Sequence, residues 1–216
     1  MNTKPLVAVI AVLAILGAVT FLYLSWPGRP PRIQLDSYQA LGEVAAEETV
    51  RLINQNGQVV VIAPDNRTAA NPAEAAQLKA FSRALKKQRG VSIEAVETFS
   101  LAPMERMALG GGVPRERFLQ VLRAHPKLAA LVLFAGFPAL EQTDFDLLKQ
   151  TGAKIVVVSG YLPGYKVLLG AGLINVAIVP RIDPAPENPK PPRTLQEWFE
   201  RDYMIVTPAK APGLPY

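Results

Sequence analysis

Apolar side chains recur with two different periods along the chain. Segments with one period alternate with segments that have the other. Between residues 37 and 57 apolar side chains recur at steps of three and four, which predicts a helix with one buried face. Residues 58–64 form an almost continuous aliphatic run, typical of a strand buried on both faces. The alternation then repeats and predicts helices at 71–90, 114–126, 143–152, 164–172 and 194–202, and strands at 91–99, 128–136, 153–160, 174–180 and 203–208.

This order of elements predicts a three-layer α/β/α sandwich around a mainly parallel sheet of five or six strands. Short connections and alternating strands and helices are typical of that class, and its crossovers are right-handed. Residues 91–99 alternate apolar with polar side chains, so we expect this strand nearer an edge. At the helix starts we expect Asp36 or Ser37, Asn71 and Thr143 as caps, with Pro72 and Pro114 in first turns.

Residues 5–25 carry no charge, and a run of about 20 apolar residues is long enough to cross a bilayer. The sequence after this run is bulky and rich in proline, unlike the small residues at a cleavage site. We therefore predict a retained single-pass anchor in a bacterial-type inner membrane. We place the N-terminus inside, which puts the following domain in the periplasm or outside the cell.

Composition shifts divide the chain into five predicted parts. These are an anchor and linker (1–31), an α/β domain (32–182), a proline-rich connection (183–193), a C-terminal helix and strand packed on the domain (194–207), and a disordered tail (208–216).

The charge distribution and the absence of some residue types limit the partners and the reactions that the sequence allows. The net charge is +5, and the densest basic cluster, Lys86, Lys87 and Arg89, lies at a predicted helix end where cations complement the helix dipole. We therefore expect no nucleic acid as partner. The chain has no cysteine and a single histidine, His125, which we place in a solvated turn, so we expect no metal, no cofactor and no catalytic triad. We explain Asp144 and Asp146 as acids in a helix start and expect Glu47 and Glu48 to be exposed.

In open α/β sheets, ligands bind beyond the carboxyl ends of the strands, at the switch point of the strand order. With strand order 2-1-3-4-5, the turns that reach this rim include three polar or glycine-containing segments. We predict a ligand-binding site formed by Asp65, Asn66, Arg67, Thr68, Gly136, Phe137, Ser159, Gly160 and Tyr161. The alternative is that Asp65 and Asn66 only make a turn before the Asn71 cap.

Three consecutive glycines, Gly110, Gly111 and Gly112, precede Val113 and Pro114. A P-loop needs a lysine and a hydroxyl residue after its last glycine, and a dinucleotide fingerprint needs spaced glycines in the first strand-helix turn. Neither pattern is present. Two interpretations stay open: an anion site at a helix start, assisted by Arg115 and Arg117, or an ordinary hinge or mobile lid.

The segments 59–66, 128–138, 153–161 and 174–182 each lead from a strand into a polar or glycine turn, and in this pattern the chain resembles one lobe of a type I periplasmic binding protein, or a flavodoxin-like domain. The resemblance implies binding of a small polar ligand without catalysis, although the chain is too short for a second lobe. Two alternatives remain: an enzyme acting on a phosphorylated or anionic substrate, and a structural subunit of an envelope complex. The predicted partners are the bilayer, a small polar ligand, and a second copy or an envelope protein.

Overall fold

The structure is a computed structural model that describes residues 4–25, 34–65, 71–158, 164–182 and 190–214. It divides into two units, residues 1–33 and 34–216. The first contains helix α1 (Lys4–Ser25), in which the described side chains are those of residues 12–22, all exposed. Within the described part of the chain, no helix has the length and apolarity required of a membrane span.

The second unit is built on a six-stranded sheet with the order β2-β1-β3-β4-β5-β6. All neighbouring strands pair in parallel except β6, which is antiparallel to β5. The mainly parallel sheet and the position of residues 91–99 at its edge confirm the sequence-based predictions. The strands are β1 (Gly57–Pro64), β2 (Val91–Phe99), β3 (Ala130–Leu133), β4 (Lys154–Val158), β5 (Val176–Pro180) and β6 (Tyr203–Val206).

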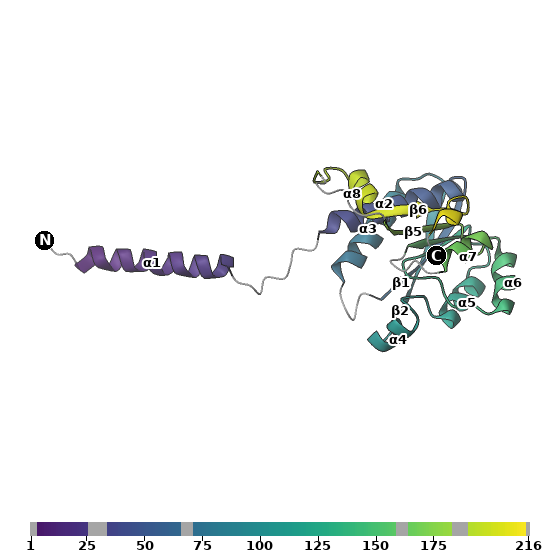
Figure 1. Ribbon diagram of the computed structural model, residues 1–216, viewed down its shortest axis with the longest axis horizontal. Helices are drawn as coiled ribbons and strands as arrows, with labels where there is room; N and C mark the ends of the chain where they lie inside the picture. The colour runs from purple at the N-terminus through teal and green to yellow at the C-terminus, as the bar shows by residue number, and fades with distance from the viewer. Residues whose placement is uncertain (1–3, 26–33, 66–70, 159–163, 183–189, 215–216) are drawn as a thin grey trace. The chain divides into compact units, whose positions relative to one another are not determined.

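Helices cover both faces of the sheet (Figure 1), and successive strand residues are buried on opposite faces. One face, which includes Val59 and Val61, packs against α2 (Leu35–Leu52), α3 (Pro72–Lys86) and α8 (Leu195–Asp202). The other, which includes Val60 and Ile62, packs against α5 (Arg115–Ala124), α6 (Gln142–Thr151), α7 (Tyr165–Gly170) and the 3₁₀ helix η1 (Ala211–Gly213). The three-layer sandwich is therefore confirmed.

Helices α2 and α3 touch at Gly42. A Cβ atom at this position would lie 2.1 Å from the carbonyl oxygen of Gln77, closer than any side chain tolerates. The missing side chain thus lets the two backbones approach each other, and this contact fixes the part of α3 that carries Gln77.

Several helix starts differ from the prediction. Gln34 is the N-cap of α2 but makes no capping hydrogen bond with its side chain, which donates to Asp36 instead, so Asp36 and Ser37 lie inside the helix. Pro114 is the N-cap of α5 rather than its first residue, and α6 begins after Glu141, so Thr143 is not its cap. The Asn71 cap is confirmed, because its side chain accepts a hydrogen bond from the Ala73 amide at 3.0 Å.

Two segments contain helices that were not predicted from the sequence. The short helix α4 (Pro103–Ala108) has no buried residue, and its sequence lacks the apolar periodicity that would have predicted it. In the expected tail, residues 208–214 form turns and η1, and Ala211 and Leu214 are buried against the α5–α7 side of the sheet. Lys166 Nζ also donates to the Leu214 carbonyl at 3.2 Å, so this stretch is anchored by apolar burial and by a polar contact.

Candidate ligand-binding cleft

A cleft of about 470 Å³ opens at the carboxyl edge of the sheet, where the prediction placed a site. The cleft wall includes the last residues of several strands, among them Pro64, Phe99 and Val158. Other parts of the wall come from α2, α3, the α4 segment and the glycine loop. The remaining lining residues are Tyr38, Leu41, Glu74, Gln77, Leu101, Arg106, Gly110, Gly111, Phe134, Ala135, Ile178, Pro180 and Tyr203.

Gln77 is the buried polar side chain of the cleft. Only 8% of the residue is exposed, and among the described residues its amide has no hydrogen-bond partner. The amide atoms themselves are open to the cleft, where they can hydrogen-bond to water or to a ligand. Gln77 therefore offers both a donor and an acceptor to a molecule in the cleft.

Two charged side chains face each other nearby. Arg106 Nη1 of α4 lies 3.9 Å from Glu74 Oε1 of α3, and the Glu74 carboxylate also accepts from Asn71 Nδ2 at 3.0 Å. The Arg106 and Glu74 side chains keep 49% and 27% of their surface exposed, so both remain available to solvent or to a ligand. Since their charges balance, the pair favours a polar molecule without net charge.

Four aromatic side chains also line the cleft. Phe99 and Phe134 lie at strand ends, while Tyr38 and Tyr203 come from α2 and β6. Burial raises the pKa of Tyr203, whose hydroxyl accepts from Ser37 Oγ at 3.4 Å. Flat apolar faces beside a few polar groups are typical of sites that bind small molecules.

The glycine loop lies on the same edge of the sheet as the cleft. Gly110 and Gly111 line the cleft and adopt positive φ values of 57° and 76°. Gly112 pairs with Gly136, the Val113 amide donates to the Gly136 carbonyl, and the Gly136 amide donates to the Gly111 carbonyl, both at 3.0 Å. A Cβ atom on Gly136 would lie 3.2 Å from the Gly112 Cα. The glycines thus allow two backbone segments to approach closely, which favours the interpretation of an ordinary connection.

The predicted site residues do not all line the same cavity. The Asp65 amide donates to the Phe99 carbonyl at 2.8 Å, directly after Pro64 in the cleft wall. Gly136 and Phe137 instead line a neighbouring apolar hollow of about 260 Å³, which also includes Phe145 and Tyr165. Gly110 borders both spaces. Six predicted residues lie outside the described part of the chain: Asn66, Arg67, Thr68, Ser159, Gly160 and Tyr161.

Arg115, which the prediction offered to an anion, already has two carboxylate partners. Its Nε and Nη2 donate to Asp144 at 2.6 and 3.0 Å, and Nη2 lies 3.0 Å from Glu141. The hydrogen bond from Arg115 lowers the pKa of Asp144 against the opposing effect of burial. The cation therefore joins α5 to the start of α6, which weighs against an anion site at this loop.

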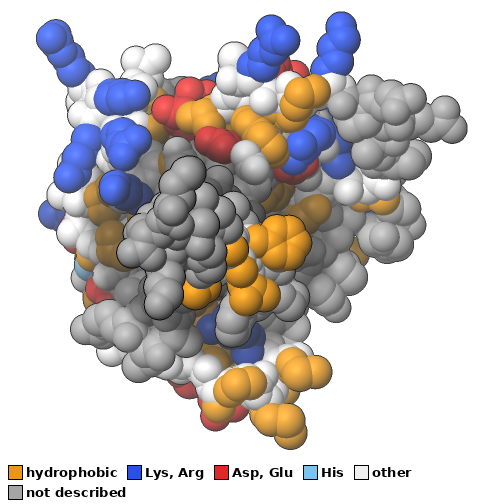
Figure 2. Space-filling view, turned by 90° about the vertical axis from the view of Figure 1, so that its left-hand side faces the viewer, with side chains coloured by type: hydrophobic (Ala, Val, Ile, Leu, Met, Phe, Trp, Pro, Cys, Tyr) orange, Lys and Arg blue, Asp and Glu red, His pale blue; other side chains and the backbone are white. Residues whose placement is uncertain are grey.

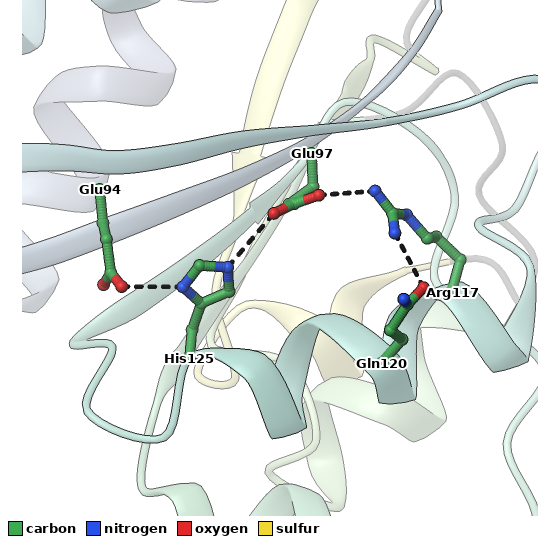
Figure 3. A network of polar contacts seen from close by, with 5 residues as sticks. All are labelled: Glu94, Glu97, Arg117, Gln120 and His125. Atoms are coloured by element: carbon green, nitrogen blue, oxygen red, sulfur yellow. Dashed lines mark hydrogen bonds and ion pairs between the residues drawn. The ribbon is translucent and has the colours of Figure 1, made fainter.

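A second polar network lies between β2 and α5 (Figure 3). His125 Nδ1 is 2.8 Å from Glu94 and Nε2 is 3.3 Å from Glu97, whose carboxylate also accepts from Arg117 at 2.5 Å. The expected solvated position of His125 is wrong, because only 13% of its side chain is exposed. The hydrogen bond to Glu94, and then that to Glu97, raises the pKa of His125 against the opposing effect of burial. This network ties an edge strand to the helix layer.

The structure also shows the burial of other single residues. Glu47 is exposed, but Glu48 is buried and pairs with Arg51, which corrects the prediction for that residue. Phe199 is buried and Trp198 is partly buried against the sheet. Within the described residues, no group of three or more His, Cys, Asp or Glu side chains is arranged to hold a metal ion.

Sequence reasoning missed the helix residues of the cleft. The buried face of α3 contains Ala73, Ala80, Phe81 and Ala84, all small or apolar, and Gln77 interrupts this stripe. A polar residue at a core position is a pattern that could have indicated the site, since buried polar groups need partners. Glu74 and Arg106 gave no such pattern, because both look like ordinary exposed charges in the sequence.

Comparisons with known proteins show the fold. No protein-family model matches the chain, and no curated protein matches it. Among solved structures, it is similar to a glucose-galactose binding protein and an arabinose binding protein from Geobacillus stearothermophilus (both TM-score 0.53; 16% and 13% identity), and to a sugar-binding protein of an ABC transporter from Bacillus halodurans (TM-score 0.52, 16% identity). These alignments cover 87%, 83% and 81% of this chain.

The chain spans only 67%, 63% and 63% of the length of those three proteins. The neighbours are solute-binding proteins with a type I periplasmic-binding-protein-like fold. The suspected resemblance in fold is therefore confirmed.

Proposed function

We propose that the α/β domain binds a small, uncharged polar molecule of the monosaccharide class in the cleft between α2, α3 and α4, without converting it. The observation that carries this proposal is Gln77, a largely buried residue whose amide lines the cleft and has no hydrogen-bond partner among the described residues. A volume of about 470 Å³ lies within the usual range for small-molecule sites, roughly 300 to 1,000 Å³. The similar folds that bind sugars support the same ligand class.

The composition of the cleft supports binding rather than catalysis. Its described lining residues include no serine, threonine, cysteine, histidine or lysine, and its one carboxylate, Glu74, lies opposite Arg106 in an ion pair. They offer instead one amide, one ion pair and aromatic faces. We propose that residues 65–68 and 159–161, which follow Pro64 and Val158 of the wall, complete the rim.

We also propose that residues 5–25 tether the domain to a membrane on its extracytoplasmic side. The support is the uncharged sequence of this segment together with the exposure of its described apolar side chains in α1, which include Leu13, Ile15 and Phe21. Protease treatment of intact cells and of spheroplasts tests the orientation. We expect the domain to be cleaved in spheroplasts, and protection until the membrane is dissolved would contradict it.

Thermal unfolding of the full chain with a panel of neutral monosaccharides, sugar phosphates and amino acids tests the ligand class. A neutral sugar at about 100 times its Kd stabilises by about 2.7 kcal/mol, which raises Tm by roughly 5 to 10 °C for a domain of this size. A larger shift with sugar phosphates would favour an anionic substrate. No shift with any compound would overturn the proposal.

The Gln77→Leu variant tests whether the sugar binds in this cleft. We expect its affinity for the stabilising sugar to fall about tenfold, the loss of one good hydrogen bond, while the stability of the free protein changes by less than about 1 kcal/mol. Gln150→Leu, at an exposed position on α6, is the matched control and should bind as the unaltered protein does. Equal affinities of the two variants would remove Gln77 from the site.

A further inference from the structure

The exposed side of the second half of α3 and the turn after it carry only basic ionisable side chains. From residue 79 to 89 there are five cations and no acid, and all five are exposed: Lys79, Arg83, Lys86, Lys87 and Arg89, here called the basic face. This number equals the net charge of the chain, +5, so the other 18 basic residues are matched by the 18 acidic ones. Five of the 23 basic residues of the chain thus lie within eleven consecutive positions.

The basic face is almost free of ion pairs within the protein. Lys87 lies 3.8 Å from Glu43, and the other four cations have no carboxylate partner among the described residues. The helix dipole accounts for Lys86 and Lys87 at the end of α3, but its influence fades within the last turn and does not reach Lys79. Figure 2 shows Lys and Arg side chains gathered along the left of the visible face. This arrangement is suited to an extended negative partner.

The basic face lies where the chain enters the domain. A groove of about 320 Å³ between the start of α2 and α3 is lined by Leu35, Gln39, Lys79 and Arg83. Leu35 is the first residue of α2, and nine residues separate it from Ser25, the end of α1. A connection of this length spans about 35 Å at most when fully extended. A membrane that holds residues 5–25 is thus within reach of these cations.

We propose that the basic face binds the anionic headgroups of the membrane to which residues 5–25 tether the chain. Several lysines and arginines on one helix, next to an apolar anchor, attract anionic lipid strongly, and the two contacts reinforce each other. A nucleic acid or an acidic protein would also meet positive charge here, but neither is held near the face by the chain itself. The inference rests on the proposed anchoring, and the experiment below separates the two.

The absence of cysteine allows a label to be placed at one chosen position. The full chain with Gln88→Cys, within the basic face, carries a fluorophore and is reconstituted into vesicles that contain spin-labelled lipid headgroups as quencher. We expect quenching in vesicles with phosphatidylglycerol, little in vesicles of phosphatidylcholine alone, and loss at 1 M salt, where the Debye length is about 3 Å. Gln150→Cys on α6, on the opposite side of the sheet, is the matched control and should stay unquenched.

Charge reversal tests the residues themselves. Lys79→Glu with Arg83→Glu and Lys86→Glu should weaken the lipid-bound state by about tenfold or more. Lys127→Glu with Lys149→Glu and Lys154→Glu changes the net charge equally at exposed positions elsewhere and should leave quenching at residue 88 unchanged. Equal quenching in neutral and anionic vesicles, or equal loss in both triple variants, would overturn the proposal.

Flotation of the same samples reports on anchoring independently. A chain that floats with neutral vesicles is anchored, whatever the quenching shows. If it floats only with anionic vesicles, and the basic-face variant does not, the proposed anchoring is wrong and the proposed lipid binding by the basic face is supported. If it floats with neither, both proposals are wrong.

Discussion

At the scale of single residues, burial gives ordinary polar side chains a specific role. Gln77 is held in the cleft wall because Gly42 lets α2 and α3 approach closely, and its amide then depends on whatever fills the cleft. His125 and Asp144 are similar in that partners from other elements decide their protonation. Two predictions follow from those partners.

The His125 network makes stability depend on pH near neutrality. Since its folded pKa lies above the unfolded value of about 6.5, the imidazolium stabilises the fold fully below that value, and the contribution is lost as pH rises through the folded pKa. We expect His125→Gln to lower the free energy of unfolding by about 1 kcal/mol at pH 5.5 and by less at pH 8.5. Urea unfolding at the two pH values measures this, and an equal difference at both would contradict it.

Asp144 has the opposite pH dependence. Its folded pKa is depressed by the hydrogen bond from Arg115, so its contribution is present above the ordinary carboxyl pKa and is lost as pH falls through the lower folded value. We expect Asp144→Asn to lower Tm at pH 7 and to have a smaller effect in acid. Asp146→Asn, at an exposed position of the same helix, is the control and should change Tm little at either pH.

At the scale of elements, buried segments could be predicted from the sequence and exposed ones could not. The strands of the sheet interior were predicted because both of their faces are covered, which demands unbroken aliphatic runs such as Val59–Ile62. Helix α4 was missed because none of its residues is buried, so packing imposed no periodicity on it. The starts of α2 and α6 were misplaced because backbone and side-chain contacts that the sequence does not display decide them.

The α2–α3 contact gives a prediction at this scale. Gly42→Ala places a methyl group against the Gln77 backbone, and such overpacking costs about 1 to 3 kcal/mol in urea unfolding. The same change also displaces Gln77, so the affinity for the ligand should fall with it. Gly170→Ala has open space around the new methyl group and should be neutral or stabilising by up to about 1 kcal/mol. Similar costs at the two positions would contradict the close approach.

At the scale of the whole molecule, the cleft joins parts of the chain that lie far apart in sequence. Tyr38, Gln77, Arg106 and Tyr203 meet only because the strand order places β1 between β2 and β3 and brings α2 beside α3. The sequence predicted a site at the edge of the sheet where this cleft lies, since the position of the switch point follows from topology. It did not identify the helix residues, because their meeting depends on packing angles that no local pattern encodes.

The central claim is that this cleft holds a small polar ligand, and a crystal structure of the full chain with the most stabilising neutral sugar tests it most directly. The account predicts density for the sugar in the cleft, with a hydroxyl group within hydrogen-bond distance of the Gln77 amide and a ring face against Phe99 or Phe134. Density in the apolar hollow beside Phe137, with Gln77 bonded only to water, would contradict it.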